Sequence, residues 1–318
     1  MATNAPEDAD QPARSGSAAP AAVHVDIDGH RLTLSNLGKT LYPATSTTKA
    51  DVIDYYRRVA PALLPHLAGR PPTLVRAPDG VDGERFFEKR CPGHRPAWLR
   101  TAPVGDYEGC CIDSLAALMW VANLAALELH THQWRTDRDG PTTVVLDLDP
   151  GPDRTVLDCR NVALDARAVL DRLGLVAFAK TSGSKGLHLS IPINGTTRPD
   201  TTVTDTETKT VALAVGQYLE VKQPDRVTTT MAKEQRVGRV FVDWSQNDRH
   251  KTTVAPYSLR IRERPTASTP ITWDELERAT TVADLEFDLH TTAARVNSLG
   301  DLWSDVLTRR QDLPDLGS

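Results

Sequence analysis

The chain has 318 residues, of which 40% are hydrophobic and 25% are charged, and its formal net charge is −5. This composition is typical of a globular protein with a full hydrophobic core, which needs neither a disulfide nor zinc to fold. It contains no run of about 18 apolar residues and no N-terminal signal pattern, so we expect neither a membrane span nor secretion. The mild acidity argues against coating nucleic acid through bulk charge and leaves room for a local basic groove.

The first part of the chain predicts a tail followed by a small α/β module. Residues 1–22 hold almost no large apolar side chain and are expected to be disordered. Hydrophobic periodicity, turn residues and cap residues then define the elements. In chain order these are a β-hairpin over 23–34, a helix over 49–66 capped by Thr48, two strands within 73–90 and a buried helix over 115–128.

The middle of the chain predicts a sheet with two crossover helices. The expected elements are a strand over 142–149, a helix over 155–172, strands over 175–180 and 187–193, a helix over 206–220 and a strand over 239–244. This β-α-β-β-α-β order is the split-βαβ arrangement of a ferredoxin-like sheet. The segment 271–310 is expected to be helical and to leave the sheet, and 306–318 to form a flexible end.

Asp147-Leu148-Asp149 is the sharpest chemical signal. Alternation along a strand places both carboxylates on one face, roughly 6–7 Å apart at Cα. Asp243 closes another strand, which the split-βαβ topology makes a central neighbour of the first. Carboxylates held together repel one another unless a hard divalent cation lies between them. The three residues predict a two-metal site for in-line phosphoryl transfer, with ordinary surface chemistry before a turn as the alternative interpretation.

The segment from Thr181 to His188 has the composition of a phosphate-binding loop. Its glycines allow backbone N–H groups to approach phosphate oxygens. Ser182 can donate hydrogen bonds, Lys185 supplies a charge, and His188 begins the next strand on the face of the carboxylates. The spacing is not that of a Walker A motif. Arg260 is a further cation that can neutralise a triphosphate; a plain hairpin and a solvated basic face are the alternatives.

Two aromatic residues and two lysines suggest contacts to nucleic acid. In a strand, one of Phe86 and Phe87 would face the core and the other would be exposed to stack on a base. Lys39 and Lys49 lie on either side of Tyr42-Pro43 and could bracket one phosphate. Core packing of the aromatics and simple solvation of the lysines are the alternative interpretations.

The cysteines predict neither a disulfide framework nor a complete zinc site. The four lie at positions 91, 110, 111 and 159 without a Cys-x-x-Cys pair, so we expect reduced thiols. Cys91-Pro-Gly-His94 has a ligand-like spacing, but the second half of a zinc motif is missing.

Taken together, these motifs resemble the polymerase domain of bacterial end-joining DNA ligase D, in the archaeo-eukaryotic primase superfamily. The resemblance runs from about Leu32 to about Leu302. Its most specific blocks are Lys39-Thr40-Leu41-Tyr42-Pro43, Phe86-Phe87-Glu88-Lys89, Leu146-Asp147-Leu148-Asp149-Pro150-Gly151, Thr181-Ser182-Gly183-Ser184-Lys185-Gly186-Leu187-His188 and Val242-Asp243-Trp244-Ser245-Gln246-Asn247. The resemblance implies an α+β primase-polymerase fold, in which a split-βαβ (RRM-like) catalytic sheet packs against an N-terminal α/β module. The implied divisions are a module over 23–140, a catalytic palm over 141–262 and C-terminal helices over 263–305.

The resemblance also implies a role for each residue singled out above. Asp147, Asp149 and Asp243 resemble the catalytic ligands of two Mn²⁺ or Mg²⁺ ions. The implied nucleotide-binding residues are His130, Ser182, Lys185, His188 and Arg260. The implied pocket for a DNA 5′-phosphate is Lys39 with Lys49, and the implied template-stacking residues are Phe86 and Phe87.

The implied function is that of a two-metal, DNA-directed polymerase, a primase-like nucleotidyltransferase. It would extend primers and fill gaps, favouring ribonucleotides, in non-homologous end joining or excision repair. Implied partners are gapped or broken DNA, NTP or dNTP, Ku and a separate ATP-dependent DNA ligase, because no ligase lysine motif appears in the chain. The implied location is cytoplasmic and nucleoid-associated.

Two other interpretations remain open from the residues. One is a metal-dependent phosphohydrolase of the Asp-x-Asp type, although Gly151 occupies the position where such enzymes have Thr or Val. The other is a non-catalytic DNA-end-binding repair module. The segment from Arg90 to Asp106 shows no motif that we can place in the family, and a loop that bridges broken ends is a candidate role for it.

Overall fold

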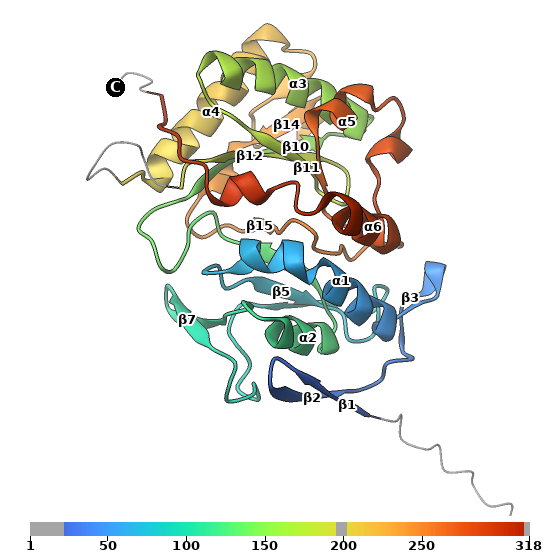
Figure 1. The fold of residues 1–318 in the computed structure, drawn as a ribbon. Helices are drawn as coiled ribbons and strands as arrows, with labels where there is room; N and C mark the ends of the chain where they lie inside the picture. Colours follow the sequence, from blue (N-terminus) through green and yellow to red (C-terminus); the bar gives the residue numbers. More distant parts are fainter. Residues whose placement is uncertain (1–21, 195–201, 315–318) are drawn as a thin grey trace, which may run out of the picture.

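Two α/β parts are stacked on one another in the computed structural model, which describes residues 22–194 and 202–314. In Figure 1 the first part of the chain, in blue and green-blue, lies below a larger sheet with helices α3 (Val156–Arg172) and α4 (Asp205–Lys222). The predicted tail over 1–22 lies outside the described residues, apart from its last position. Among the helices described, none is both long and apolar enough to cross a membrane.

The lower part contains a four-stranded sheet and three small hairpins. The order in the sheet is β15 (Thr253–Val254), β9 (Ala126–Thr131), β5 (Thr73–Arg76) and β6 (Phe86–Glu88). The hairpins pair β1 (Val23–Ile27) with β2 (His30–Leu34), β3 (Thr40–Tyr42) with β4 (Thr47–Thr48), and β7 (Thr101–Val104) with β8 (Tyr107–Cys110). The predicted hairpin over 23–34 and the two strands within 73–90 are confirmed.

Helix α1 (Lys49–Leu67) begins where its cap was predicted. The Thr48 side chain accepts a hydrogen bond from the Asp51 N–H, and the Asp51 carboxylate accepts one from the Thr48 N–H, which makes a capping box. From the buried face of the helix, the Tyr55 hydroxyl donates to the Tyr257 carbonyl at 2.7 Å. The helix is thereby fastened to a segment that lies about 200 residues later in the chain.

Helix α2 (Leu115–Asn123) is shorter than the predicted helix over 115–128. Ser114 caps it by accepting a hydrogen bond from a backbone N–H of the first turn. The left-handed conformation of Ala125, with φ of 56°, then ends the helical path, and β9 begins at the next residue. The prediction was wrong at this end because one unbroken apolar run serves both the helix and a buried strand, which periodicity alone does not separate.

The larger sheet has six strands. Their order is β13 (Val227–Thr228), β14 (Val240–Asp243), β10 (Thr143–Pro150), β12 (Leu187–Pro192), β11 (Phe178–Thr181) and β16 (Pro270–Ile271). Without the short outer strands, the remaining four stand in the order 4-1-3-2 with every neighbouring pair antiparallel. The predicted split-βαβ order is confirmed. The strand of Asp243 lies beside that of Asp147, although the central pair of the sheet is β10 and β12.

The two faces of this sheet differ in chemistry because side chains alternate along each strand. Leu146 and Leu148 of β10 belong to the hydrophobic core shared with α3 and α4, so Asp147 projects from the opposite face. In Figure 1 the two helices cover the upper side of the sheet, and β15 and the lower part of the molecule lie across the other side. Polar residues of the sheet therefore face the junction between the two parts.

The C-terminal segment stays in contact with the sheet. Its first residues form β16, which pairs with β11, so the prediction that the chain leaves the sheet at 271 was wrong at that point. Helices α5 (Trp273–Arg278) and α6 (Leu289–Leu299) follow. The Gln311 side chain then accepts from the Val176 N–H and donates to the Pro192 carbonyl, so the described part of the predicted flexible end is packed. Residues 315–318 lie outside the described range.

Short 3-10 helices complete the described structure at Pro43–Thr45, Lys233–Arg236, Trp244–Asn247, Val282–Leu285 and Ser304–Leu307.

Cys91 and Cys110 form a disulfide, which corrects the expectation of reduced thiols for this pair. The loop after β6 returns to hairpin β7–β8, where the Cys91 N–H donates to the Glu108 carbonyl, and the two Cα atoms lie 4.8 Å apart. That separation is within the range of a disulfide. His94, the other half of the ligand-like motif, lies against the Trp120 ring instead, with centroids 6.1 Å apart.

Candidate active site

A row of four polar residues crosses the larger sheet on the face that meets the lower part. In neighbouring strands, Lys180 is paired with His188, His188 with Asp147, and Asp147 with Asp243. Each of the four is less than a tenth exposed. Because residues paired in register project from the same face of a sheet, the row brings together three predicted site residues that are far apart in the sequence.

Asp149, two residues after Asp147 on the same face, completes a cluster of three carboxylates. Burial raises the pKa of Asp147, and the charges of Asp149 and Asp243 raise it further. Burial and then Asp243 also raise the pKa of Asp149. His188 Nε2 is 3.2 Å from Asp147 Oδ1, but their orientation does not make a hydrogen bond, so this buried oxygen has no donor. Mutually repelling carboxylates with an unsatisfied oxygen suit a divalent cation.

Asp243 is engaged by its own neighbours. Its Oδ1 accepts from the Ser245 N–H at 3.0 Å, and its Oδ2 accepts from Gln246 Nε2 at 2.8 Å. Within residues 22–194 and 202–314, no three His, Cys, Asp or Glu side chains are already gathered around one metal position. The fit of the cluster to a metal therefore rests on its set of hard oxygen ligands and on the unsatisfied oxygen of Asp147.

A cavity of about 510 Å³ opens beside Asp147 and Asp149. All five predicted nucleotide-binding residues line it: His130, Ser182, Lys185, His188 and Arg260. His130 belongs to β9 of the lower part, whereas the carboxylates belong to β10, so the cavity lies at the junction of the two parts. Lys233 and Arg236 add further positive charge to its wall. Cations that converge on a cavity beside carboxylates are arranged to hold a polyphosphate.

Glu128 is a member of the site that the sequence analysis missed. His130 Nε2 lies 2.7 Å from Glu128 Oε2, Arg260 Nε lies 3.2 Å from Glu128 Oε1, and the Ile261 N–H donates to Oε1 at 2.7 Å. Burial opposes the ionisation of Glu128, but the hydrogen bond from His130 and the charge of Arg260 outweigh it and hold the pKa at about 2. The available signal was the spacing Glu128-x-His130, which places both side chains on one face of a strand.

Lys180 was also missed, although it begins the polar row. The residue is 2% exposed, and its ammonium donates to Ser268 Oγ at 2.6 Å and lies 5.7 Å from the centroid of the Trp303 ring. Burial and then Arg260 lower the pKa of Lys180. Nothing in its local sequence separates it from a solvated lysine at the end of a strand.

The glycine-rich loop is held in place by Ser182. Its Oγ accepts from the Ser184 N–H at 3.2 Å and from the Gly186 N–H at 3.1 Å, and its carbonyl accepts from Arg260 Nη1 at 2.6 Å. A Cβ at Gly186 would lie 2.1 Å from the Leu148 carbonyl oxygen, so only glycine allows the loop to lie this close to β10. A hydroxyl oxygen that accepts two N–H bonds still carries its own proton to donate.

Lys39 and Lys49 lie close to one another but do not line this cavity. The Lys49 N–H donates to the Lys39 carbonyl at 2.8 Å. Lys39 Nζ is 2.6 Å from Asp79 Oδ1, and Lys49 Nζ donates to the Ser35 carbonyl at 2.7 Å. Burial and the neighbouring charge of Lys39 lower the pKa of Lys49 to about 8. The two lysines therefore form a separate positive site.

Phe86 and Phe87 are both exposed, at 44% and 73%. The prediction that one of them faces the core was wrong. Strand β6 is short, stands at the edge of its sheet and pairs only with β5, so neither of its faces is covered at this point. Two adjacent exposed aromatic rings suit stacking on nucleic-acid bases.

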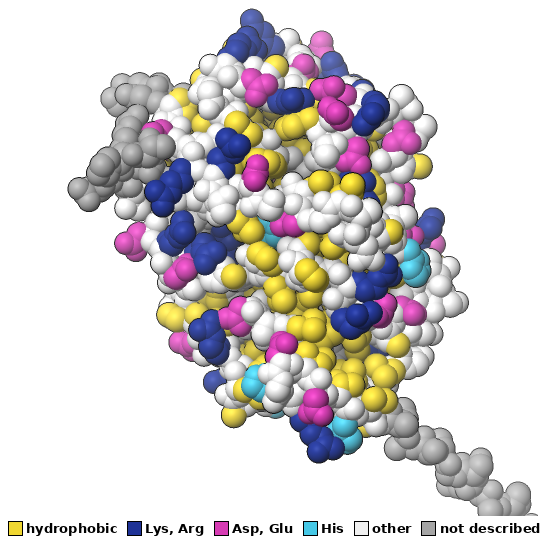
Figure 2. Space-filling view, viewed as in Figure 1, with side chains coloured by type: hydrophobic (Ala, Val, Ile, Leu, Met, Phe, Trp, Pro, Cys, Tyr) yellow, Lys and Arg dark blue, Asp and Glu magenta, His cyan; other side chains and the backbone are white. Residues whose placement is uncertain are grey.

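Positive charge also gathers outside the cavities, although the whole chain is acidic. In the view of Figure 2, Lys and Arg side chains cluster on both sides of the molecule near the level where the two parts meet, and a band of hydrophobic side chains runs between them. A net negative charge is therefore compatible with locally basic regions on the surface.

Comparisons with known proteins agree with this geometry. A family model described as the LigD primase-polymerase domain matches residues 48–303. The multifunctional non-homologous end joining DNA repair protein LigD of Mycobacterium tuberculosis strain H37Rv is 47% identical over 260 residues, which are 78% of this chain and 34% of that protein. The bifunctional non-homologous end joining protein LigD of Bacillus subtilis is 30% identical over 284 residues, 89% of this chain and 45% of that protein.

A solved structure has the same fold. The polymerase domain from Mycobacterium tuberculosis ligase D, in complex with DNA, matches with a TM-score of 0.80 and 42% identity over 88% of this chain and 99% of that chain. This chain spans about a third of the length of the mycobacterial relatives that it matches.

Proposed function

The chain belongs to the LigD primase-polymerase domain family, and from this premise we propose that it catalyses template-directed nucleotidyl transfer at gaps and breaks in DNA. The observation that carries the proposal is the register of β10 and β14, which places Asp243 opposite Asp147, with Asp149 on the same face. Asp147 and Asp149 border a cavity that Lys185, Lys233, Arg236 and Arg260 also line. Acidic and basic groups in this arrangement suit the transfer of a phosphoryl group from a triphosphate.

Asp147, Asp149 and Asp243 are the residues that would hold the metal ions, Mn²⁺ or Mg²⁺. Such ions, when bound, stabilise the charge that develops on the transferring phosphoryl group. The other residues act by binding and orientation: Lys185 and Arg260 neutralise the triphosphate, and Ser182 donates a hydrogen bond to it. His188 lies between Asp147 and Lys180 in the row and orients the group that approaches the carboxylates.

His130 is proposed to contact the sugar of the incoming nucleotide. Its imidazole is held by Glu128 at 2.7 Å and lines the cavity. A ring that is fixed in this way can recognise a hydroxyl group by hydrogen bonding, which supports the proposal that ribonucleotides are favoured over deoxyribonucleotides.

Contacts to DNA are proposed for the two surfaces outside the cavity. Phe86 and Phe87 are exposed and would stack on template bases. Lys39 and Lys49 would bind a 5′-phosphate. Lys39 would then give up its ion pair with the exposed Asp79 and pair with the phosphate instead. Ku and an ATP-dependent DNA ligase are proposed as partners in end joining, and gap filling in excision repair would use the same chemistry.

Primer extension on a gapped duplex, with Mn²⁺ or Mg²⁺ and with each class of nucleotide, tests the proposal. We expect Asp147→Ala and Asp149→Ala each to reduce nucleotide addition at least about a hundredfold, because each removes a carboxylate that holds metal. DNA binding should change less than about twofold, because phosphate contacts elsewhere dominate it. Asp171→Ala, at an exposed aspartate on α3, is the matched control. Extension by either active-site variant within tenfold of the parent rate would refute the assignment.

A further inference from the structure

A second cavity, of about 630 Å³, adjoins the first one. The two cavities share Pro150, Ser184 and Lys185, so the glycine-rich loop forms part of both walls. Most of the other lining residues lie within 261–287 or within 154–156 at the start of α3, and Arg85 also lines the cavity. The proposed nucleotide site does not use this second cavity.

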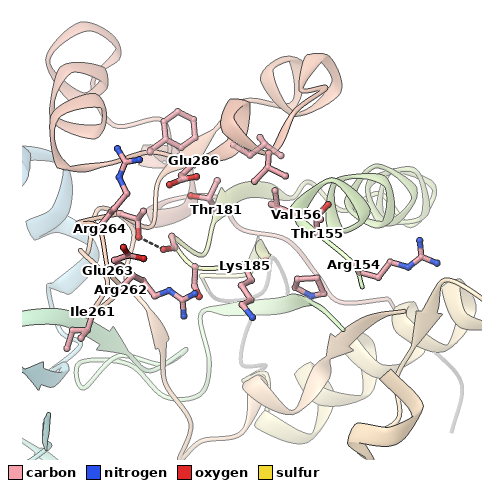
Figure 3. A pocket seen from close by; sticks show the side chains of 18 of the residues that line it. Arg154, Thr155, Val156, Thr181, Lys185, Ile261, Arg262, Glu263, Arg264 and Glu286 are labelled. Carbon is pink, nitrogen blue, oxygen red and sulfur yellow. Dashed lines mark hydrogen bonds between the residues drawn. The ribbon is translucent and has the colours of Figure 1, made fainter. Parts of the chain in front are cut away.

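Cations outnumber carboxylates around the second cavity. The charged residues that line it are Arg85, Arg154, Lys185, Arg262, Arg264, Glu263 and Glu286. Arg262 and Arg264 are exposed, and Figure 3 shows the cationic ends of Arg262 and Lys185 turned into the same space. Arg154 and Arg264 point away from that space in the same view. The Arg154 guanidinium is engaged by Asp158 and by the Gly238 carbonyl, whereas Arg264 is exposed. The cavity therefore attracts anions.

The cavity also has an apolar wall. Val156, Leu285 and Phe287 line it, and Val282 at its rim is 45% exposed. A volume of about 630 Å³ is in the range of pockets that enclose whole organic molecules. Positive charge on one side and an apolar surface on the other suit a phosphate together with a base, rather than an inorganic phosphate alone.

The wall between the two cavities is preformed. Thr266 Oγ1 donates to the Gly183 carbonyl at 2.6 Å. Gly183 has a φ of 67°, and a Cβ there would lie 2.6 Å from the backbone of Ala267. The loop is thus packed directly against the segment that carries Arg262 and Arg264, so a ligand can bind without first ordering this wall.

The position of Arg85 connects the cavity to the proposed template surface. Arg85 lines the cavity, and the next two residues in the chain are the exposed Phe86 and Phe87. We propose that this cavity binds one or two nucleotides of the single-stranded template overhang, beyond the bases that stack on the two phenylalanines, with Arg262 and Arg264 on the phosphates. The inference rests on the proposed function, because it presupposes a DNA template.

Fluorescence anisotropy, without any nucleotide present, tests this proposal. The probes are two duplexes with a recessed 3′ end, identical except for template overhangs of one and six nucleotides. We expect the parent protein to bind the longer overhang at least fivefold more tightly and R262Q/R264Q to reduce that advantage below twofold. On the longer overhang, the slope of log K against log salt should become less steep by about 1.4, or 0.7 for each of two lost single-strand phosphate contacts.

Two further variants make the result specific. R226Q/R310Q removes the same charge from exposed arginines that line neither cavity, and it should keep the full advantage. V282E adds a carboxylate at the rim and should weaken binding of the longer overhang only. An unchanged advantage in R262Q/R264Q, or an equal loss on both duplexes, would overturn the proposal.

A third result would identify a different ligand. R262Q/R264Q could keep the overhang advantage and yet make nucleotide addition less sensitive to inhibition by inorganic pyrophosphate. In that case the cavity holds the leaving group, and the template assignment is wrong. Failure of the proposed function is seen separately, as a parent protein that binds both duplexes but adds no nucleotide to either one.

Discussion

Glu128 connects two parts of the proposed nucleotide site that come from different segments of the chain. Glu128 holds His130, which lies on the same strand, and also forms an ion pair with Arg260. Arg260 in turn donates a hydrogen bond to the Ser182 carbonyl of the glycine-rich loop. Because the pKa of Glu128 is about 2 in the folded protein, below its usual 4.5, its charge stabilises the fold above pH 4.5. That contribution is lost as the pH falls toward 2. At any ordinary assay pH the carboxylate is therefore ionised.

We expect Glu128→Gln to weaken nucleotide binding because the neutral amide loses the ion pair with Arg260 and the charged acceptor that holds His130. Hydrogen bonds to charged groups contribute about 1.5–3 kcal/mol, which corresponds to a rise in KM of about ten- to a hundredfold. The change in kcat should be smaller. Steady-state kinetics on a gapped duplex measures both constants, with Glu108→Gln on the exposed side of β8 as the control. A lower kcat with an unchanged KM would contradict the role given to Glu128.

At the scale of elements, the sequence predicted most of the larger sheet because its signals are local. The alternation in Asp147-Leu148-Asp149 places acidic and apolar side chains on opposite faces whatever the rest of the fold does. The order of strands and helices then restricts the topology, and the topology brought Asp243 to Asp147. Each step used the period of a strand or the order of the elements along the chain.

The features that sequence reasoning missed depend on tertiary packing. The boundary between α2 and β9 lies inside one apolar run and is set by the backbone of Ala125. The Cys91–Cys110 disulfide depends on how a loop folds back to a hairpin. Lys180 is covered by Ser268 and Trp303, which lie about 90 and 120 residues later in the chain. None of these depends on a pattern within a short window of residues.

The glycine-rich loop allows a direct test of an element. In Gly186→Ala, the new Cβ would lie 2.1 Å from the Leu148 carbonyl oxygen, so the loop or β10 must move. Overpacking of this kind costs about 1–3 kcal/mol of unfolding free energy, and the displaced Ser182 should also reduce nucleotide binding. Gly38→Ala is the control, because nothing lies within 4 Å of its added Cβ. Urea unfolding of both variants measures the difference, and equal midpoints would show that the close contact is absent in solution.

At the scale of the whole molecule, the site exists only while the two parts are packed together. His130 and Glu128 come from β9 of the lower part, and the carboxylates come from the larger sheet. Strand β15 pairs with β9 in the four-stranded sheet and follows β14 of the larger sheet in the chain, so this pairing connects the two parts. The C-terminal segment adds a second connection through Asp301, which accepts from His66 of α1 at 2.9 Å and from the Tyr257 hydroxyl at 2.7 Å.

This second connection should add to the stability of the whole molecule without deciding whether its two parts unfold together. Burial alone would raise the pKa of Asp301, but its hydrogen bonds from His66 and Tyr257 lower the pKa overall, so the carboxylate is ionised and firmly held. Asp301→Ala leaves both donors buried without their acceptor, which costs about 2–4 kcal/mol. Because the two parts share β15 and the core around α1, we expect a single unfolding transition at a lower urea concentration. Far-UV circular dichroism and tryptophan fluorescence should show the same midpoint, and nucleotide addition should be lost over the same range.

Asp305→Ala, at an exposed position of the same segment, should leave the midpoint unchanged. Two separate transitions in Asp301→Ala would mean that the parts fold independently and that Asp301, rather than the shared sheet, is what couples them.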